Sequence, residues 1–263
     1  IPVLLEETIA ALNIRTGGIY VDCTFGGGGH SKAILQQLGA DGKLVAFDQD
    51  ADAAKNLPAG QAGLPADERV LFIPQNFRHL QRFLRLHGIT AVDGILADLG
   101  VSSHQFDEAE RGFSTRFNAD MDMRMDRRQS LTAFEVVNTY TEQRLHKLFE
   151  LYGEVTNAKT LAKKITEVRG TTSLKTIDGF KNAIREIVKG NPQKYFAQVF
   201  QALRIEVNDE LGALKEMLQQ IPSLLKPGGR AAIITFHSLE DRLVKIFFRR
   251  GSFDEPEEHP FIN

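Results

Sequence analysis

Short apolar runs of strand length recur along this chain of 263 residues, and stretches with helical periodicity lie between them. The apolar runs are nearly continuous, which is typical of strands that are buried on both faces of a parallel sheet. Helical periodicity is found at residues 32–38, 77–86 and 209–225. This alternation predicts an open, doubly wound α/β sheet. The predicted strands are residues 19–21, 43–47, 70–73, 92–97 and 230–236.

The alternation stops after Asp98, and residues 106–202 have a mainly helical pattern. A segment of this length is too long for a structureless loop in a compact domain. We therefore predict a helical domain, residues 106–202, inserted between the fourth and fifth strands. Residues 1–105 and 203–263 then form the sheet domain. Three helices of the insert are expected to begin at Thr141, Asn157 and Thr176.

The composition is that of an ordinary globular protein, with 42% hydrophobic residues, which is enough for a sizeable core. No apolar run approaches the roughly 20 residues that a membrane-spanning helix needs, and no signal peptide is recognised. A single cysteine, Cys23, excludes a disulfide framework within the chain and a Cys-rich zinc site. We expect a cytoplasmic protein without a membrane partner, either a monomer or a dimer.

The charge is distributed unevenly, although the formal net charge is only −2. Residues 155–205 carry ten Lys and Arg against three Asp and Glu. Such a segment could face a polyanion. A solvated helical surface without a partner would explain the same charge equally well.

Four consecutive glycines follow the first predicted strand, in the stretch VDCTFGGGGHS of residues 21–31. Glycine disfavours regular elements by roughly 0.5–1 kcal/mol relative to alanine, but it lets a ligand approach the backbone closely. The predicted helix that follows adds unpaired N–H donors. Asp48 ends the second predicted strand, where a carboxylate can accept hydrogen bonds from both hydroxyls of a ribose. Together these features predict a site for a nucleoside-containing cofactor, whereas the glycines alone would fit a tight turn.

Two cofactor classes compete for this site. The dinucleotide pattern G-x-G-x-x-G is matched only in part, because Ser31 stands where the third glycine belongs. S-adenosylmethionine needs an acid near the end of the first strand, glycines, and an acid after the second strand; Asp22, residues 26–29 and Asp48 supply these. The stretch LLKPGGR, residues 224–230, resembles the turn before the fifth strand of many methyltransferases. S-adenosylmethionine is therefore the predicted cofactor, and an NAD-dependent oxidoreductase is the alternative.

Eight longer motifs are far more specific than the glycine run. They are PVLLEETI (2–9), TFGGGGHS (24–31), DLGVSSHQFD (98–107), RGFS (111–114), DMRMD (122–126), YGE (152–154), FQALRIEVNDEL (200–211) and TFHSLEDR (235–242). In this order they resemble the bacterial cytosine-N4 methyltransferases of small-subunit ribosomal RNA, the MraW/RsmH family. The resemblance implies a Rossmann-like class I S-adenosylmethionine-dependent methyltransferase fold with an inserted helical domain.

The same resemblance implies an activity and a partner. The activity is methylation of the exocyclic N4 amine of a decoding-centre cytidine, and the partner is 16S rRNA in the small ribosomal subunit. A non-catalytic RNA-binding protein that keeps the pocket as a relic is an alternative from another class, and the intact Asp48 and Asp98 argue against it.

The resemblance also assigns cofactor contacts to seven residues. The backbone of residues 28–30 would donate to the methionine end, Asp48 would hold the ribose, and Phe77 would lie against the adenine. A core aromatic is the alternative for Phe77, and a helix cap or a loop carboxylate is the alternative for Asp98. The assigned residues are Gly28, Gly29, His30, Asp48, Phe77, Asp98 and Gln105.

The chemistry needs an acceptor for the amine N–H, because the lone pair of an exocyclic amine is delocalised into the ring. After the fourth strand, Asp98, Ser102 and Ser103 are available, and Asp98 is the predicted catalytic residue. His237, which follows the fifth strand, is the second candidate. Ser238 is expected to cap the next helix. The scattered histidines lack metal-ligand spacing, so no metal is predicted.

Recognition of the RNA is expected from the basic part of the insert. The target cytidine must be unstacked before it can reach a methyl donor. Lysine and arginine side chains of the insert would contact phosphates. The residues in question are Lys159, Lys163, Lys164, Arg169, Lys175, Lys181, Arg185, Lys189 and Lys194.

Overall fold

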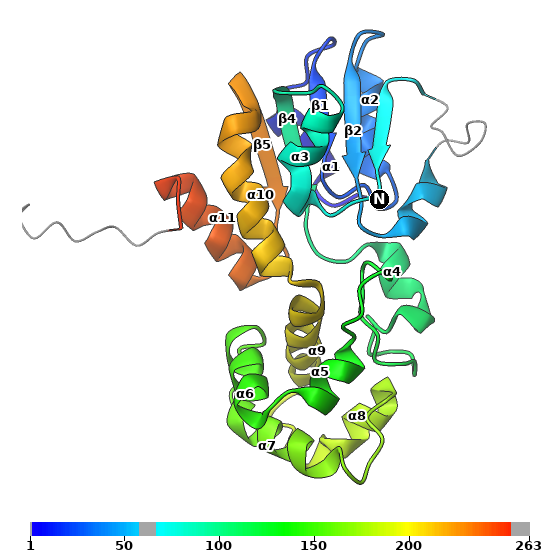
Figure 1. Cartoon of the computed structure of the whole chain (residues 1–263), viewed down its shortest axis with the longest axis vertical. Helices are drawn as coiled ribbons and strands as arrows, with labels where there is room; N and C mark the ends of the chain where they lie inside the picture. Colours follow the sequence, from blue (N-terminus) through cyan, green and yellow to red (C-terminus); the bar gives the residue numbers. More distant parts are fainter. Residues whose placement is uncertain (1, 58–66, 254–263) are drawn as a thin grey trace, which may run out of the picture.

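The computed structural model describes residues 2–57 and 67–253, and within them five strands form one sheet. All four strand pairs are parallel, in the order β3-β2-β1-β4-β5 (Figure 1). This order confirms the predicted open, doubly wound α/β sheet, and it reverses between β1 and β4. The strands are β1 (Ile19–Asp22), β2 (Lys43–Phe47), β3 (Val70–Ile73), β4 (Val92–Asp98) and β5 (Leu225–Ile234).

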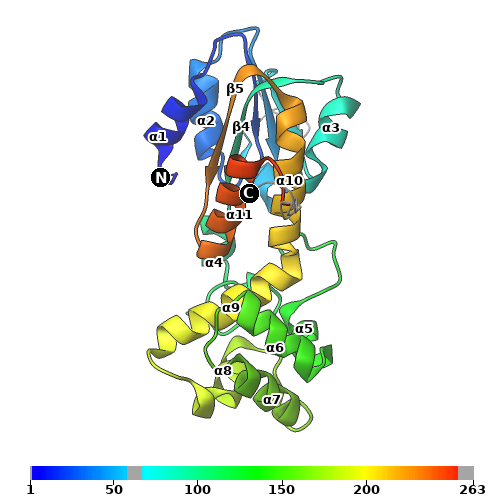
Figure 2. The same ribbon diagram turned by 90° about the vertical axis from the view of Figure 1, so that its left-hand side faces the viewer.

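The sheet is covered on both faces because neighbouring residues of a strand point to opposite sides. Tyr20 and Leu44 belong to the apolar cluster on one face, and Val21 and Val45 belong to the cluster on the other. Figure 2 shows α1 and α2 on one side of the sheet and α3 and α10 on the other, where α11 also joins the cluster. These helices are α1 (Leu5–Leu12), α2 (Gly29–Gln37), α3 (Leu80–Leu86), α10 (Glu210–Leu224) and α11 (Ser238–Arg250).

A helical lobe lies beyond the carboxyl edge of the sheet, at the bottom of Figure 1. It has its own apolar core, whose buried residues run from Phe113 to Val207. The side chains of Thr141 and Thr176 cap α6 and α8, as predicted. Asn157 precedes α7, but its amide donates to the Ile187 carbonyl instead of capping. The helices are α5 (Ala133–Thr139), α6 (Glu142–Leu151), α7 (Ala158–Val168), α8 (Ile177–Ala183) and α9 (Pro192–Asn208).

Short elements complete the described chain, and α9 leads directly into α10. At that junction Asp209 adopts a left-handed conformation with φ 45°.

No helix in residues 2–57 and 67–253 is both long and apolar enough to cross a membrane. The domain boundaries after residues 105 and 202 stay predictions. The short elements are α4 (Ser103–Asp107) and the 3-10 turns η1 (Ala51–Asn56), η3 (Phe77–His79), η4 (Ala109–Arg111) and η5 (Arg185–Ile187).

The fifth strand differs from its predicted bounds. It begins at Leu225, which pairs with Val92, and Arg230 pairs with Gly94, so the four residues between them bulge out of register. The LLKPGGR stretch is therefore part of an irregular strand, and the prediction that it forms a turn before the strand was wrong. The bulge is held to the sheet because Lys226 Nζ lies 2.7 Å from Asp93 Oδ2.

Candidate functional site

A cleft of about 620 Å³ opens at the carboxyl edge of the sheet. Its walls come from the loop between β1 and α2, the ends of β2 and β4, the start of α10 and the segment after β5. This edge, beside the reversal of strand order, is where open α/β sheets bind ligands. The residues with predicted cofactor roles that line the cleft are Gly29, His30, Asp48, Phe77, Asp98 and Gln105.

The glycine loop owes part of its composition to its own geometry. Gly26 and Gly28 have positive φ values of 49° and 73°. A Cβ atom on Gly28 would lie 3.0 Å from the ring of Phe25, and Gly28 is not among the residues that line the cleft. Gly29, which begins α2, does line it, and a Cβ there would overlap Pro2. Gly28 therefore allows the turn of the loop on the side away from the cleft, and the backbone of Gly29 is exposed to the cleft.

The buried Asp22 side chain stabilises this loop by hydrogen bonds. Its carboxylate accepts hydrogen bonds from Thr24 N–H at 3.0 Å and from the Ser31 hydroxyl at 2.7 Å. Burial raises the pKa of Asp22, although these hydrogen bonds oppose the rise. Asp22 is buried and does not line the cleft. It was expected to belong to the cofactor set, but it shapes the loop instead of facing a ligand.

Asp48 connects the end of β2 to the glycine loop. Its Oδ2 accepts from Gly26 N–H at 2.7 Å and its Oδ1 accepts from Asp50 N–H at 2.8 Å. Burial is the main cause that raises the pKa of Asp48 to about 6, and the nearby Asp50 charge adds to the rise. Each carboxylate oxygen has a second acceptor position. Asp48 can therefore still accept hydrogen bonds from the two hydroxyls of a ribose.

A buried ion pair behind the cleft was not predicted from the sequence. The Arg111 side chain is only 2% exposed, and its Nη1 lies 2.8 Å from Asp50 Oδ2. Its Nη2 donates to the carbonyls of Arg124 and Met125, at 3.0 and 3.1 Å. This contact fixes the DMRMD segment of the helical lobe against the end of β2. The partners lie about 60 positions apart in the sequence, and no local pattern connects them.

Gln105 belongs to the same network. Its side-chain N–H donates to Asp50 Oδ2 at 2.8 Å, and its carbonyl oxygen accepts from Ser102 N–H at 3.1 Å. Gln105 is buried and lines the cleft. Its amide therefore positions Asp50 and the segment after β4, whatever contact it also makes with a ligand.

Asp98 and His30 lie near each other in the cleft wall. His30 Nε2 lies 3.0 Å from the Val3 carbonyl, which can only accept, so this nitrogen carries a proton. His30 Nδ1 lies 3.7 Å from Asp98 Oδ2, which is too long for a hydrogen bond. Asp98 Oδ1 is buried and has no hydrogen-bond partner within the described residues. The Asp98 side chain as a whole is 23% exposed and lines the cleft, so its carboxylate is available to a ligand there.

The charge state of Asp98 is set by its surroundings. Burial is the largest influence and raises its pKa to about 6. The His30 ring opposes this rise, and the carboxylates of Asp22 and Glu240 add to it. Asp98 is therefore mostly ionised at neutral pH, and it takes up a proton in mildly acidic solution.

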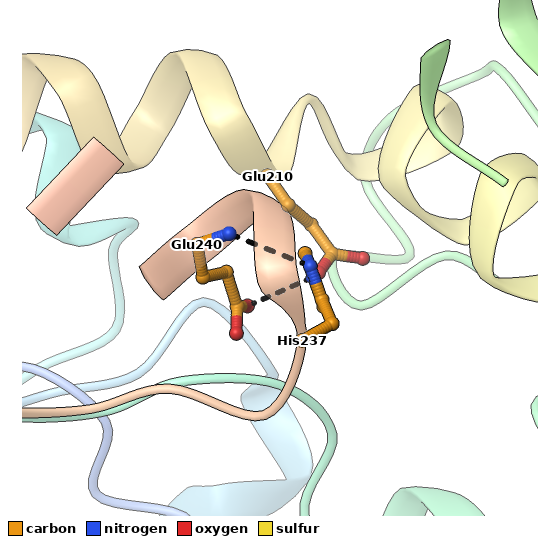
Figure 3. A group of neighbouring side chains, drawn as sticks. All are labelled: Glu210, His237 and Glu240. Atoms are coloured by element: carbon orange, nitrogen blue, oxygen red, sulfur yellow. Dashed lines mark hydrogen bonds and ion pairs between the residues drawn. The ribbon is translucent and has the colours of Figure 1, made fainter. Parts of the chain in front are cut away.

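His237 lies beside Glu240 at the start of α11 (Figure 3). Its Nδ1 accepts from Glu240 N–H at 3.5 Å, and its Nε2 lies 3.3 Å from Glu240 Oε1. His237 does not line the cleft, whereas Glu240 does. His237 therefore caps α11, and the prediction that Ser238 is the cap was wrong. Ser238 is the first residue of the helix, and its hydroxyl lies 3.5 Å from Glu154.

Glu210, His237 and Glu240 have donor atoms within 4.8 Å of one another, a spacing that would suit a divalent cation. In the structure, however, these donor atoms already interact with other protein groups. Both carboxylate oxygens of Glu210 accept from Arg204, at 2.7 and 2.9 Å. Because His237 Nδ1 accepts a hydrogen bond, the proton of the neutral ring sits on Nε2, which leaves no lone pair for a metal. We therefore describe this cluster as two neighbouring ion pairs, Glu210 with Arg204 and Glu240 with His237, where the starts of α10 and α11 lie close together.

Comparison with known proteins assigns the chain to a family. The family model described as the MraW methylase family matches residues 1–263. The chain belongs to the MraW methylase family. The sequence resemblance to this family is thereby confirmed over the whole chain.

Curated relatives agree with this assignment. The ribosomal RNA small subunit methyltransferase H of Flavobacterium johnsoniae is 54% identical over 99% of this chain and 84% of its own length. The protein of the same name from Christiangramia forsetii is 52% identical over 100% of this chain and 85% of its own. A solved structure of a cyclopropane-fatty-acyl-phospholipid synthase-like protein from Lactobacillus casei aligns with 93% of this chain and 82% of its own. Its identity of 11% and TM-score of 0.28 are too low to add to the assignment.

The methyl donor of this family of methylases is S-adenosylmethionine, and the cleft suits it. The loop of residues 26–29 offers backbone without side chains, and Asp48 keeps free acceptor positions for hydroxyl groups. Phe77 is half-buried and provides an apolar wall. The protein is an α/β methyltransferase with a cleft at the switch point of a parallel sheet.

Proposed function

We propose that this methyltransferase methylates the exocyclic N4 amine of a decoding-centre cytidine in 16S ribosomal RNA of the small ribosomal subunit. The curated relatives are named small-subunit ribosomal RNA methyltransferases, which supports this class of substrate. The structural observation that carries the proposal is Asp98, a half-buried carboxylate that lines the cleft and has one oxygen without a hydrogen-bond partner among the described residues. The cytoplasm, where ribosomal subunits are assembled, is the proposed location.

The cofactor roles of individual residues are part of this proposal. The backbone at Gly29 and His30 would hold the methionine end, Asp48 the ribose, and Phe77 the adenine. Gly28 and Gln105 would contribute by shaping the loop and by fixing Asp50. When bound, S-adenosylmethionine supplies an electrophilic methyl group on its sulfonium sulfur.

Asp98 would act on the nucleophile. Its carboxylate lines the cleft and is 23% exposed, so it can accept an N–H of the amine, which favours a more tetrahedral nitrogen with an available lone pair. As N4 gains the methyl group it must lose one proton. Asp98, with a pKa of about 6, is ionised at neutral pH and can receive this proton. Holding both reactants in line supplies much of the remaining rate.

His237, the second catalytic candidate, would act only through its neighbour. Its ring does not line the cleft and contacts Glu240 instead. The His237 contact, together with the Phe236 N–H and the Arg204 charge, lowers the pKa of Glu240 although burial acts strongly in the opposite direction. We therefore propose His237 as a positioning residue that keeps Glu240 ionised and in place.

The proposal is tested with small subunits purified from a strain that lacks the corresponding methylase. Methyl transfer from labelled S-adenosylmethionine is followed by nucleoside mass spectrometry. We expect one N4-methylcytidine per subunit with the wild-type protein, and a rate at least about 100-fold lower with Asp98→Asn.

Asp107→Asn is the matched control, because Asp107 is exposed and does not line the cleft. It should retain wild-type activity. Methylation of another base or of another atom would contradict the proposed substrate. Equal rates for Asp98→Asn and the wild type would remove Asp98 from the mechanism.

A further inference from the structure

Phe236 is an aromatic residue that lines the cleft and has no role in the mechanism proposed above. Its side chain is 54% exposed although it lines the cleft. The other two phenylalanines of the cleft, Phe25 and Phe77, are buried and half-buried. An exposed apolar ring at the wall of a polar cleft gains stability only when another surface covers it.

The backbone of Phe236 is held in place by buried groups. Its N–H donates to Glu240 Oε2 at 2.8 Å. The side chains of Glu240 and His237 are 3% and 8% exposed, and they contact each other. The backbone that carries the exposed ring is therefore tied to the buried pair of His237 and Glu240 at the start of α11, shown in Figure 3.

The ring also lies close to the segment that carries Asp98. A Cβ atom added to Gly100 would be 3.3 Å from Phe236 Cδ2. Gly100 is two residues beyond Asp98, and its φ of 95° is favourable for glycine only. The cleft thus brings together an exposed aromatic ring that follows β5 and the half-buried carboxylate of Asp98 at the end of β4.

We infer that Phe236 is the stacking platform for the unstacked target base, whose amine it directs toward Asp98. The inference rests on the proposed function and adds a specificity-determining residue to it. A phenyl ring has no hydrogen-bonding group, so it holds any planar base by its face. Asp98 then selects a base that carries an exocyclic N–H donor. Binding of the base covers the ring and removes its exposed apolar surface from water.

The test compares Phe236→Leu, Phe236→Tyr and wild type in methyl transfer to small subunits. Phe236→Leu should lose about 5- to 100-fold in kcat/KM, the range expected for the loss of one base–aromatic stack. Phe236→Tyr should recover most of this loss because its ring also stacks. The Kd for S-adenosylmethionine, measured by calorimetry, should not change in any of them.

Phe248→Leu is the matched control. Phe248 is 58% exposed on α11 and does not line the cleft, so its variant should match the wild type. Equal kcat/KM for Phe236→Leu and the wild type would overturn the inference. A parallel loss of S-adenosylmethionine affinity would also overturn it, because the ring would then belong to the cofactor subsite.

A second measurement separates this inference from the proposed function. Cytidine monophosphate is titrated into the protein saturated with S-adenosylhomocysteine, and binding is followed by NMR. Weaker binding to Phe236→Leu than to the wild type supports the stacking platform even if the wild type does not methylate small subunits. Binding that is absent, or that does not depend on Phe236, overturns it.

Discussion

Asp98 and His30 illustrate how single residues set the chemistry of this cleft. The hydrogen bond from His30 Nε2 to the Val3 carbonyl leaves an unprotonated Nδ1 toward Asp98 when the ring is neutral. Burial is the larger influence and raises the pKa of Asp98 from 3.8 to about 6, whereas the His30 ring acts in the opposite direction. Asp98 can thus change its charge state close to physiological pH.

The first prediction concerns pH. The ionised form of Asp98 accepts the amine N–H, and its pKa is raised, so activity should be present above about pH 6 and should fall as the pH drops through that value. We expect kcat to fall about tenfold for each pH unit below the pKa. The measurement is kcat at saturating substrate between pH 5 and 8. A flat profile over this range would show that protonation of Asp98 does not control the reaction.

Among the elements, the glycine loop has two kinds of glycine. Gly28 has φ 73°, and a Cβ there would meet the Phe25 ring at 3.0 Å. A Cβ on Gly27 would meet nothing within 4 Å, and Gly27 is not in the left-handed region. Backbone geometry therefore requires glycine at position 28, whereas position 27, which lines the cleft, has room for a side chain.

The second prediction compares the two glycines in the ligand-free protein. Gly28→Ala should lower the free energy of unfolding by about 1–3 kcal/mol, because of its strained φ and the contact with Phe25. Gly27→Ala should change it by less than about 1 kcal/mol. Urea denaturation of both variants measures the difference. Similar losses for both would mean that the loop conformation does not depend on the left-handed Gly28.

Turn η4 connects the helical lobe to the sheet through Arg111. The guanidinium is buried between Asp50 and the carbonyls of Arg124 and Met125. Removing one partner of a buried ion pair leaves an uncompensated charge. This contact should therefore contribute far more to stability than the exposed pair between Arg116 and Asp107.

The third prediction follows from this difference. Arg111→Ala should lower the free energy of unfolding by about 3–5 kcal/mol, and Arg116→Ala should lower it by less than about 1 kcal/mol. Thermal and urea denaturation measure both. Comparable effects of the two substitutions would contradict the role of Arg111 as the buried link between the helical lobe and β2.

Element positions were predicted well where the pattern was local. The bounds of β2 and β3 match because each contains an uninterrupted apolar run, residues 44–47 and 70–73, that ends at Asp48 or Pro74. The start of β5 was missed because Lys226, Pro227 and two glycines favour a turn, whereas pairing with β4 and the contact to Asp93 keep the segment in the sheet. Asp48 and Asp98 were located as cleft residues from their places at strand ends. The link between Arg111 and Asp50 was missed because it is a tertiary contact.

For the whole molecule, the basic surface of the helical lobe is smaller than its composition indicates. The Arg169 guanidinium donates to the Tyr140 carbonyl at 2.7 Å, and Lys164 Nζ lies 2.9 Å from Glu186 Oε2. These two residues, predicted to contact phosphates, already have partners within the lobe. Composition alone overestimates the charge available to a ligand, because it does not show which Lys and Arg side chains already bind other groups of the protein.

The cleft between the glycine loop and the carboxylates at the strand ends is the feature on which the whole account depends. Both competing cofactor classes contain a nucleoside, so a shared ribose site alone does not separate them. The glycine pattern and the membership of the MraW methylase family both favour a methyl donor without phosphates.

Calorimetric titration of the folded protein with S-adenosylmethionine, and separately with NAD, tests this most directly. We predict saturable binding of S-adenosylmethionine at one site per chain and no measurable binding of NAD. A folded protein that does not bind S-adenosylmethionine, or that binds NAD in the same site, would contradict the account.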